Sequence, residues 1–281
     1  MKNGMHILLS TFFVLMFSNA VLAQDFEYHP RLSDNLTITL GAFKSDHSFK
    51  ISAEGNIDDE IESKIDFGNT VGVDESSTFF NGQVRWKFGK NRKWSVWGQY
   101  FSNNATGNAV LTEDIEWQDV IFREGTFVGA GVKLAVTRVF FGRSFVKNQQ
   151  HDFGLGIGIH YLDMSIFIEG DIKIDDGSTD FFRGDADKSQ PLPNIGAWYN
   201  FSPARKWLIH GRVDWISADI GDYDGTLWNA AVGVNFQAFR HVGFDLSYQY
   251  FNLNLKVTKT DWNGGLDMTY SGPVLSVTGN W

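Results

Sequence analysis

Few residues of this chain could perform acid–base or nucleophilic chemistry. There is no cysteine, which excludes a thiol nucleophile, thiolate metal ligands and disulfide bonds. A hydrolase would need a serine or similar nucleophile beside a histidine base that a third group holds in place. The histidines after residue 23 are His29, His47, His151, His160, His210 and His241. The sequence places no competent nucleophile with any of them, so we predict that the chain is not an enzyme.

Two segments look like ligand-binding motifs but lack part of the pattern. The run from Asp219 to Gly225 is spelled like a calcium loop, yet it lacks the glutamate that completes an EF-hand loop. Gly154, Gly156 and Gly158 are spaced like a dinucleotide fingerprint, but no helix follows them to cradle a phosphate. We therefore predict no metal site and no cofactor, and we interpret the glycines as positions of close packing.

The remaining polar residues of interest are charged or amide side chains that alternate with apolar ones. If the segments that carry them are strands of a barrel, these side chains face the lumen and can satisfy one another across it. We predict that the lumen is lined by Arg85, Lys87, Lys133, His160, His210, Arg212, Asp214, Gln237, Asp245 and Gln249. His160 and His210 then belong to a hydrogen-bonded network and not to a reaction centre.

The segments that must position these residues alternate with a period of two. In 207–215 every second residue is apolar or glycine, whereas the residues between them include His210 and Asp214. The stretches 228–238 and 244–250 repeat this pattern. Soluble strands run about 5 or 6 residues, whereas a tilted membrane strand needs about 9 to 11, and these segments have the longer length.

The connections between the segments are of two kinds. Short, mostly basic turns bracketed by aromatic residues occur at 88–94, 145–153, 201–207 and 239–244. The connections on the other side are long and acidic, at 56–75 and 168–190. Short turns with aromatic rings at one rim and long loops at the other are typical of an outer-membrane barrel, with the short turns in the periplasm and the acidic loops outside the cell.

The chain ends on an alternating strand with Leu275, Val277 and Trp281 on one face. Here it resembles Gram-negative outer-membrane β-barrel proteins, which end in an aromatic residue on such a strand. The resemblance implies a location in the cell outer membrane, with Trp281 as the assembly signal that the barrel-assembly machinery reads.

We predict an all-β fold, an antiparallel transmembrane β-barrel of about ten strands. The predicted strands lie near 34–45 (or to 54), 77–89, 93–112, 125–145, 152–167, 192–201, 206–217, 226–239, 243–258 and 267–281. The segment 56–72 could add a hairpin and give twelve. An even number returns both ends of the chain to the same side of the membrane.

The N-terminal 23 residues have the three parts of a secretory signal. Lys2 is followed by an apolar run and by the small-residue ending Val21-Leu22-Ala23. The alternative of an uncleaved anchoring helix is less favoured, because polar residues such as Ser10 and Asn19 interrupt the run. We predict that residues 1–23 are a signal peptide and that 24–281 form one barrel domain.

The formal net charge of −9 argues against a nucleic-acid partner, because no basic stripe is present to replace phosphate counterions. We expect outer-membrane lipid and lipopolysaccharide as partners, and a monomer. We predict a barrel with a narrow, charge-paired polar lumen that acts as a structural or surface protein or binds a small solute. A porin-like small-solute channel is the alternative, and a lipid-modifying enzyme is less favoured.

Overall fold

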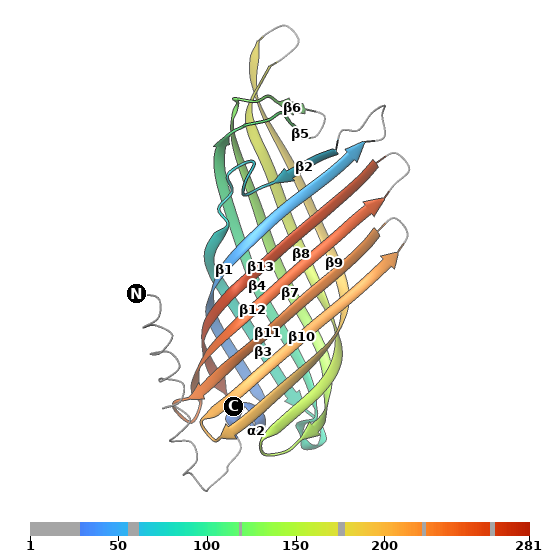
Figure 1. Cartoon of the computed structure of the whole chain (residues 1–281). Coiled ribbons are helices and arrows are strands. Elements are labelled where there is room, and N and C mark those ends of the chain that lie inside the picture. The colour runs from blue at the N-terminus through green and yellow to red at the C-terminus, as the bar shows by residue number, and fades with distance from the viewer. Residues whose placement is uncertain (1–28, 56–61, 118–119, 174–177, 221–222, 259–261) are drawn as a thin grey trace, which may run out of the picture.

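The computed structural model describes residues 29–55, 62–117, 120–173, 178–220, 223–258 and 262–281, and most of this part of the chain is strand (Figure 1). The strands are β1 (Leu36–Gly55), β2 (Glu62–Asp66), β3 (Ser76–Phe88), β4 (Trp94–Val110), β5 (Ile115–Trp117), β6 (Val120–Phe122), β7 (Phe127–Lys147), β8 (His151–Lys173), β9 (Thr179–Ala204), β10 (Trp207–Ile220), β11 (Tyr223–Gln237), β12 (Val242–Thr258) and β13 (Trp262–Asn280). The short helical segments are α2 (Pro30–Ser33) and the 3-10 turn η1 (Lys90–Arg92).

Ten strands close into an antiparallel barrel in the order β1-β3-β4-β7-β8-β9-β10-β11-β12-β13. The last strand pairs back onto the first, from Thr37↔Asn280 to Gly55↔Trp262. This confirms the predicted all-β antiparallel barrel of ten strands. The alternative of twelve is wrong for the part of the chain described. There β2 pairs only with the end of β1, and β5 and β6 form a separate two-stranded sheet.

The two ends of the barrel differ. Short turns join β3 to β4, β7 to β8, β9 to β10 and β11 to β12 at one end, which we call the short-turn end. The C-terminus and α2 also lie there (Figure 1). At the opposite end, the loop end, the hairpin of β8 and β9 rises well beyond the other strands (Figure 1).

The predicted acidic loop 168–190 is mostly strand. β8 and β9 stay paired from His151↔Phe201 to Lys173↔Thr179, so the predicted strand 192–201 is only part of a much longer β9. Acidic side chains such as Asp185 and Asp187 are exposed on this tall hairpin. Acidic composition predicted a loop wrongly here, because a strand that extends into water can carry charges on its outer face.

Toward the short-turn end, the strands turn apolar side chains outward and polar side chains inward. On β12, Leu246 and Tyr248 are 59% and 52% exposed, whereas Asp245 and Gln249 are buried. Similar exposed apolar side chains occur on the other strands, among them Leu40, Val84, Val139, Ile157, Val232 and Leu275. A broad band of exposed apolar side chains around a barrel suits contact with lipid chains.

Toward the loop end, the same strands reverse this polarity. On β7, Val132 and Leu134 are buried inside the barrel while Lys133 between them is exposed outside. On β12, Phe251 is buried inside and its neighbour Asn252 faces out. Successive side chains still alternate between the inner and the outer face without a shift along the strand. Only the kind of residue on each face is reversed, because here the outer face meets water and the interior holds an apolar core.

The residues before β1 fold back into the lumen at the short-turn end. Pro30 opens α2, a position where no backbone N–H is required, and the Nδ1 atom of His29 accepts a hydrogen bond from the Arg31 N–H at 3.2 Å. Arg31 and Leu32 are buried. The predicted signal, 1–23, lies outside the described residues. No helix in the described part of the chain combines the length and the apolarity that crossing a membrane requires.

Candidate functional site

Asp214, on the inner face of β10, is the centre of a buried ionic network. The Arg138 guanidinium, from β7, donates to Asp214 Oδ1 at 2.6 Å, and Arg212 Nη1 lies 3.4 Å from Asp214 Oδ2. The side chains of Arg138 and Asp214 are only 2% and 1% exposed. Gln99 accepts a further hydrogen bond from Arg212 at 2.5 Å. Two arginines therefore depend on one carboxylate.

His160 packs beside this network with both ring nitrogens engaged. Its Nδ1 lies 3.1 Å from Asn194 Oδ1, and its Nε2 lies 2.9 Å from Asn229 Nδ2. A neutral imidazole satisfies both contacts, because Nδ1–H donates to one amide and Nε2 accepts from the other. This histidine is held in the network and is not a free base.

Asp245, on β12, is the centre of a second network nearer the short-turn end. Its Oδ2 accepts from Arg31 Nη1 at 2.8 Å and lies 2.8 Å from His210 Nε2. Asn235 Nδ2 donates to the same oxygen at 3.3 Å. Because Arg31 belongs to α2, this carboxylate ties the N-terminal segment to the barrel wall.

Lys87, on β3, holds the same segment from the other side. Its Nζ donates to the carbonyl oxygens of Arg31 and Leu32, at 2.8 and 3.1 Å. Burial, together with the nearby cations of Arg31 and Lys87, lowers the pKa of His29 to about 3. His29 is therefore neutral at physiological pH, and α2 forms a docked plug in the lumen, which we call the α2 plug.

A third ion pair joins Arg85 on β3 to Asp152 on β8, at 3.2 Å. Ser144 Oγ donates to Asp152 at 2.6 Å, and Trp198 Nε1 donates to it at 3.3 Å. The Arg85 guanidinium also lies over the Trp97 ring, 4.3 Å from its centroid. Trp198 in turn covers Gly154, one of the glycines predicted to mark close packing, because a Cβ on Gly154 would lie 2.2 Å from its ring; Gly156 and Gly158 lie against Phe140 instead.

Neutral amides complete the polar half of the lumen. Asn81 Nδ2 donates to Gln249 at 2.9 Å, and Asn280 Nδ2 donates to Gln237 at 3.1 Å. Gln237 itself donates to the carbonyl oxygen of Phe239 at 2.8 Å. These side chains are buried and hydrogen-bonded to one another or to backbone carbonyl oxygens.

Nine of the ten predicted lumen residues lie on the inner face: Arg85, Lys87, His160, His210, Arg212, Asp214, Gln237, Asp245 and Gln249. Lys133 was predicted wrongly. It is exposed on the outer face, between Asn104 of β4 and Ser165 of β8 in the sheet. The assignment of polar residues to the lumen fails there because this part of β7 lies beyond the apolar band.

Three residues of the ionic networks, Arg138, Asp152 and Arg31, are not among the predicted lumen residues. Arg138 shares the inward phase of β7 with Val136 and Phe140, and the alternation of that strand was the signal that could have found it. Asp152 stands at the start of β8 beside a turn, and Arg31 precedes every strand. No periodic pattern marks Arg31, because the contact with Asp245 is created by the fold.

The predicted charge-paired lumen occupies only half of the barrel, and the other half is apolar. Toward the loop end the interior is filled by a cluster that includes Phe43, Phe49, Phe101, Leu134, Ile166, Phe251, Met268 and Tyr270, each at most 4% exposed. The polar, charge-paired interior is therefore confined to the part of the lumen toward the short-turn end. In the polar half, a residual cavity of about 50 Å³ lies among Gln99, His210 and Arg212.

Parts of the chain from the loop end cover the apolar cluster. Phe67 and Val71 are fully buried in it, and the same segment bridges to β4 through Val73↔Gly107. Gly107 is required there, because a Cβ on it would lie 1.8 Å from a backbone oxygen of this segment. The β5–β6 hairpin packs on the other side, where Trp117 Nε1 donates to the Gly184 carbonyl oxygen at 3.1 Å.

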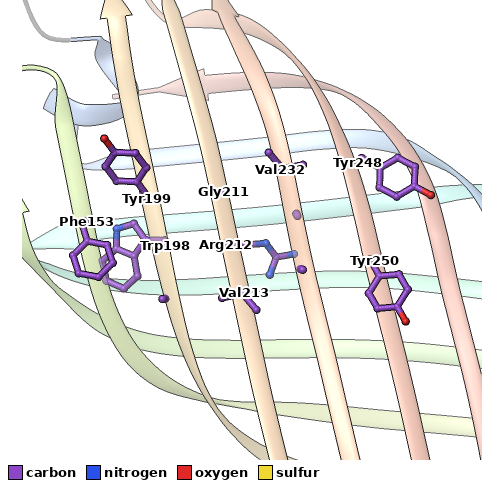
Figure 2. A pocket seen from close by; sticks show the side chains of 12 residues that line it. Phe153, Trp198, Tyr199, Gly211, Arg212, Val213, Val232, Tyr248 and Tyr250 are labelled. Atoms are coloured by element: carbon purple, nitrogen blue, oxygen red, sulfur yellow. The ribbon is translucent and has the colours of Figure 1, made fainter.

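The outer wall carries a depression of about 410 Å³ over β9, β10 and β11 (Figure 2). It forms where the small residues Ala197, Gly211 and Ala230 face outward. The rings of Phe153, Tyr199, Tyr248 and Tyr250 surround it (Figure 2). Lipid chains can fill such a depression. Across the described residues, no group of three or more His, Asp or Glu could hold a metal ion.

The fold, but not the sequence, is similar to known proteins. No protein-family model and no curated protein matches the chain. The outer membrane protease OmpT from Escherichia coli is 9% identical, with a TM-score of 0.56, over 89% of this chain and 97% of that one. The toluene transporter TodX from Pseudomonas putida is 8% identical, with a TM-score of 0.36, over 91% and 93%. The translocator domain of autotransporter NalP from Neisseria meningitidis is 9% identical, with a TM-score of 0.39, over 100% and 97%.

The likeness to OmpT at this identity concerns the fold alone. The chain thus has the architecture of Gram-negative outer-membrane β-barrels, and this architecture implies the cell outer membrane. The short-turn end is then the periplasmic end, and the loop end faces the outside of the cell.

Proposed function

We propose that this protein is a closed outer-membrane barrel, a structural or binding element of the cell surface that neither conducts solutes nor catalyses a reaction. The observation that carries the proposal is the filling of the lumen at successive levels. The α2 plug closes the periplasmic end, the networks around Asp245, Asp152 and Asp214 fill the middle, and the apolar cluster fills the outer half.

Barrel size supports a closed lumen. Eight strands leave an interior that side chains can fill, whereas open aqueous channels occur at about sixteen or more. Ten strands stand close to the smaller limit. Large inward side chains such as Arg138, Trp198 and Phe251 then suffice to bridge the space.

A non-catalytic role is supported by the state of the inward histidines. Both ring nitrogens of His160 contact amides, and His210 Nε2 contacts the Asp245 carboxylate that also binds Arg31. An enzyme would keep such a base free toward a nucleophile and a substrate.

Partners of this proposed role are outer-membrane lipid, lipopolysaccharide and the barrel-assembly machinery, with the barrel itself a monomer. Trp281, the proposed assembly signal, is 54% exposed and exchanges backbone hydrogen bonds with Leu36 at the seam between the last and first strands. Export by a cleaved signal, 1–23, belongs to the same proposal.

Conductance of the refolded protein in a planar lipid bilayer tests the closed lumen. The wild type should show no steady current, because the plug and the networks leave no continuous water path. The variant Asp214→Ala should flicker, since it frees Arg138 and Arg212 to move. Asp114→Ala, on an exposed loop, is the matched control and should behave as the wild type. A large steady current through wild-type protein would refute the proposal and favour a small-solute channel whose inward arginines are its selectivity lining.

A further inference from the structure

The barrel wall splits between β9 and β10. These strands pair from Trp207↔Ala204 to Trp215↔Ile195, and there the pairing stops. Beyond this point β9 still runs to Thr179, paired with β8, and β10 still runs to Ile220, paired with β11. In the described residues no strand lies between the two diverging edges, and Figure 1 shows the tall β8–β9 hairpin leaning away from β10 and β11.

Two prolines on β9 account for the position of the split. Pro191 and Pro193 pair with Tyr161 and Ile159 of β8 without interruption. Proline has no backbone N–H, so it is tolerated in a sheet where its missing donor faces an unpaired edge. The donors missing from β9 therefore fall on the side of β10, and the ladder cannot extend beyond Ile195 without losing hydrogen bonds.

A groove of about 300 Å³ lies in the split. Leucine and isoleucine side chains from β9 to β12 line it, namely Leu192, Ile216, Leu227, Leu253 and Leu255. Leu227 and Leu253 belong to the apolar cluster of the lumen, and Leu192 and Ile216 pack against that cluster. The groove thus opens through the barrel wall and ends on the apolar cluster. A closed inner end is expected of a binding site, whereas a channel would continue into the lumen.

The mouth of the groove lies at the outer edge of the apolar band. Ile195, Trp215 and Trp228, just below the split, are 56%, 38% and 43% exposed. Toward the loop end the outward positions of β9 are Pro193 and Pro191 and then the polar Ser189, and on β10 the next outward residue is Ser217. Because exposed tryptophans favour the lipid headgroup level, the groove opens where the lipid chains of the outer leaflet give way to headgroups.

The rim of the groove is polar and carries a cation. Lys188 and Gln190 share the inward phase of β9 with Leu192, yet both are exposed, because the wall that would cover them is absent. An occupant with its apolar part on the leucines would therefore place its polar head beside the Lys188 ammonium.

A second seam of the barrel, between β3 and β4, shows what such a gap accommodates. β3 and β4 pair only from Asn81↔Phe101 to Phe88↔Trp94, and beyond that point the chain inserts its own apolar side chains, Phe67, Val71 and Val73. Nothing in the described residues fills the β9–β10 seam in this way.

We propose that the β9–β10 groove binds the alkyl chain of an amphiphile with an anionic head, entering sideways at the level of the outer leaflet. Burial of the chain on Leu192, Leu227 and Leu253 supplies the affinity, and Lys188 selects the head. This inference names a ligand class for the binding role proposed above. It is tested by chain binding and not by conductance, so the two proposals can fail separately.

Protection of an introduced thiol tests the groove. The chain has no cysteine, so Leu192→Cys places a unique thiol on the groove floor, and Asn104→Cys places one on the far outer face as the matched control. Each full-length variant is refolded and placed in phosphatidylcholine nanodiscs. The rate of modification by a water-soluble thiol reagent is then measured alone, with added oleate, or with phosphatidylglycerol replacing part of the lipid. The last two arms distinguish a free amphiphile from a membrane lipid as the source.

We expect protection at position 192 only. With oleate at about ten times its dissociation constant, the fraction of molecules whose groove is unoccupied falls about tenfold, and the modification rate falls with it. Lys188→Glu in the Leu192→Cys background should shift the oleate dependence to higher concentration, and a trimethylammonium analogue of the same chain should protect less than oleate. Equal rates with and without both anionic amphiphiles, or equal slowing at position 104, would overturn the proposal. Equal protection by the cationic analogue would overturn the role of Lys188.

Discussion

Removal of the carboxylate of Asp214 should destabilise the barrel more than any other single truncation of a lumen acid. Asp214→Ala leaves the guanidinium groups of Arg138 and Arg212 buried without their anion, and the two side chains are only 2% and 8% exposed. Loss of one partner of a buried pair costs about 3 to 5 kcal/mol, since it leaves an uncompensated charge. Because two cations share this carboxylate, we expect about 5 kcal/mol, the upper end of that range.

Urea unfolding of the refolded protein in lipid vesicles measures this loss as a lower free energy of unfolding. Asp114→Ala is the control: Asp114 pairs with Arg123 at 2.6 Å but on an exposed loop, where water screens the pair, and the unfolding curve should not move. Asp214→Asn should fall between the two, because the amide keeps an acceptor for Arg138 and removes the charge. If Asp214→Ala unfolds at the same urea concentration as Asp114→Ala, the network is hydrated and the dry, filled lumen is wrong.

Three further predictions follow from the faces, the plug and the N-terminus. Val232→Arg puts a charge on the lipid-facing wall and should cost about 2 to 4 kcal/mol of folding free energy in vesicles. The control Asn104→Arg lies outside the apolar band and should fold with wild-type yield. Equal yields of the two variants would mean that the faces are assigned wrongly. The α2 plug should loosen as the pH falls from 6.5 toward 3. The pKa of His29 in the docked plug is lowered to about 3, so in this pH range His29 takes up a proton only when the plug is released. Protease access to the plug should therefore rise with acid in the wild type but not in His29→Gln. Protein extracted from outer membranes should begin at Gln24, and N-terminal sequencing that reads Met1 would refute the predicted signal.

The lumen illustrates how far alternation predicts a membrane barrel. His210, Arg212 and Asp214 were placed inside correctly, because each stands opposite apolar residues on a strand whose outer face meets lipid. Lys133 was placed inside wrongly by the same logic. Polar residues face the lumen only in the part of a strand that lies within the membrane. Where the strand continues into water, the fold is more stable with polar residues on the outer face and apolar residues inside.

Three places in the sequence mark this reversal. At Tyr100-Phe101, Tyr161-Leu162 and Tyr250-Phe251 two large apolar residues stand side by side and break the simple alternation. In each pair the tyrosine is exposed on the outer face and its neighbour is buried inside. In these three pairs the tyrosine stands where the lipid-facing band ends, and its neighbour stands where the apolar core begins.

The sequence by itself determined the antiparallel barrel, an even number of strands near ten, the short-turn end and most of the inward faces. These features follow from local rules, namely period two, strand length and turn chemistry, that each segment obeys on its own. Only the tertiary structure decided which charges meet, as in Arg31 with Asp245 and Arg85 with Asp152, residues far apart in the chain. It also decided that the pairing of β9 with β10 ends at Ile195. The groove forms because the two strands do not pair beyond this residue, and which strands pair depends on which ones are neighbours in space.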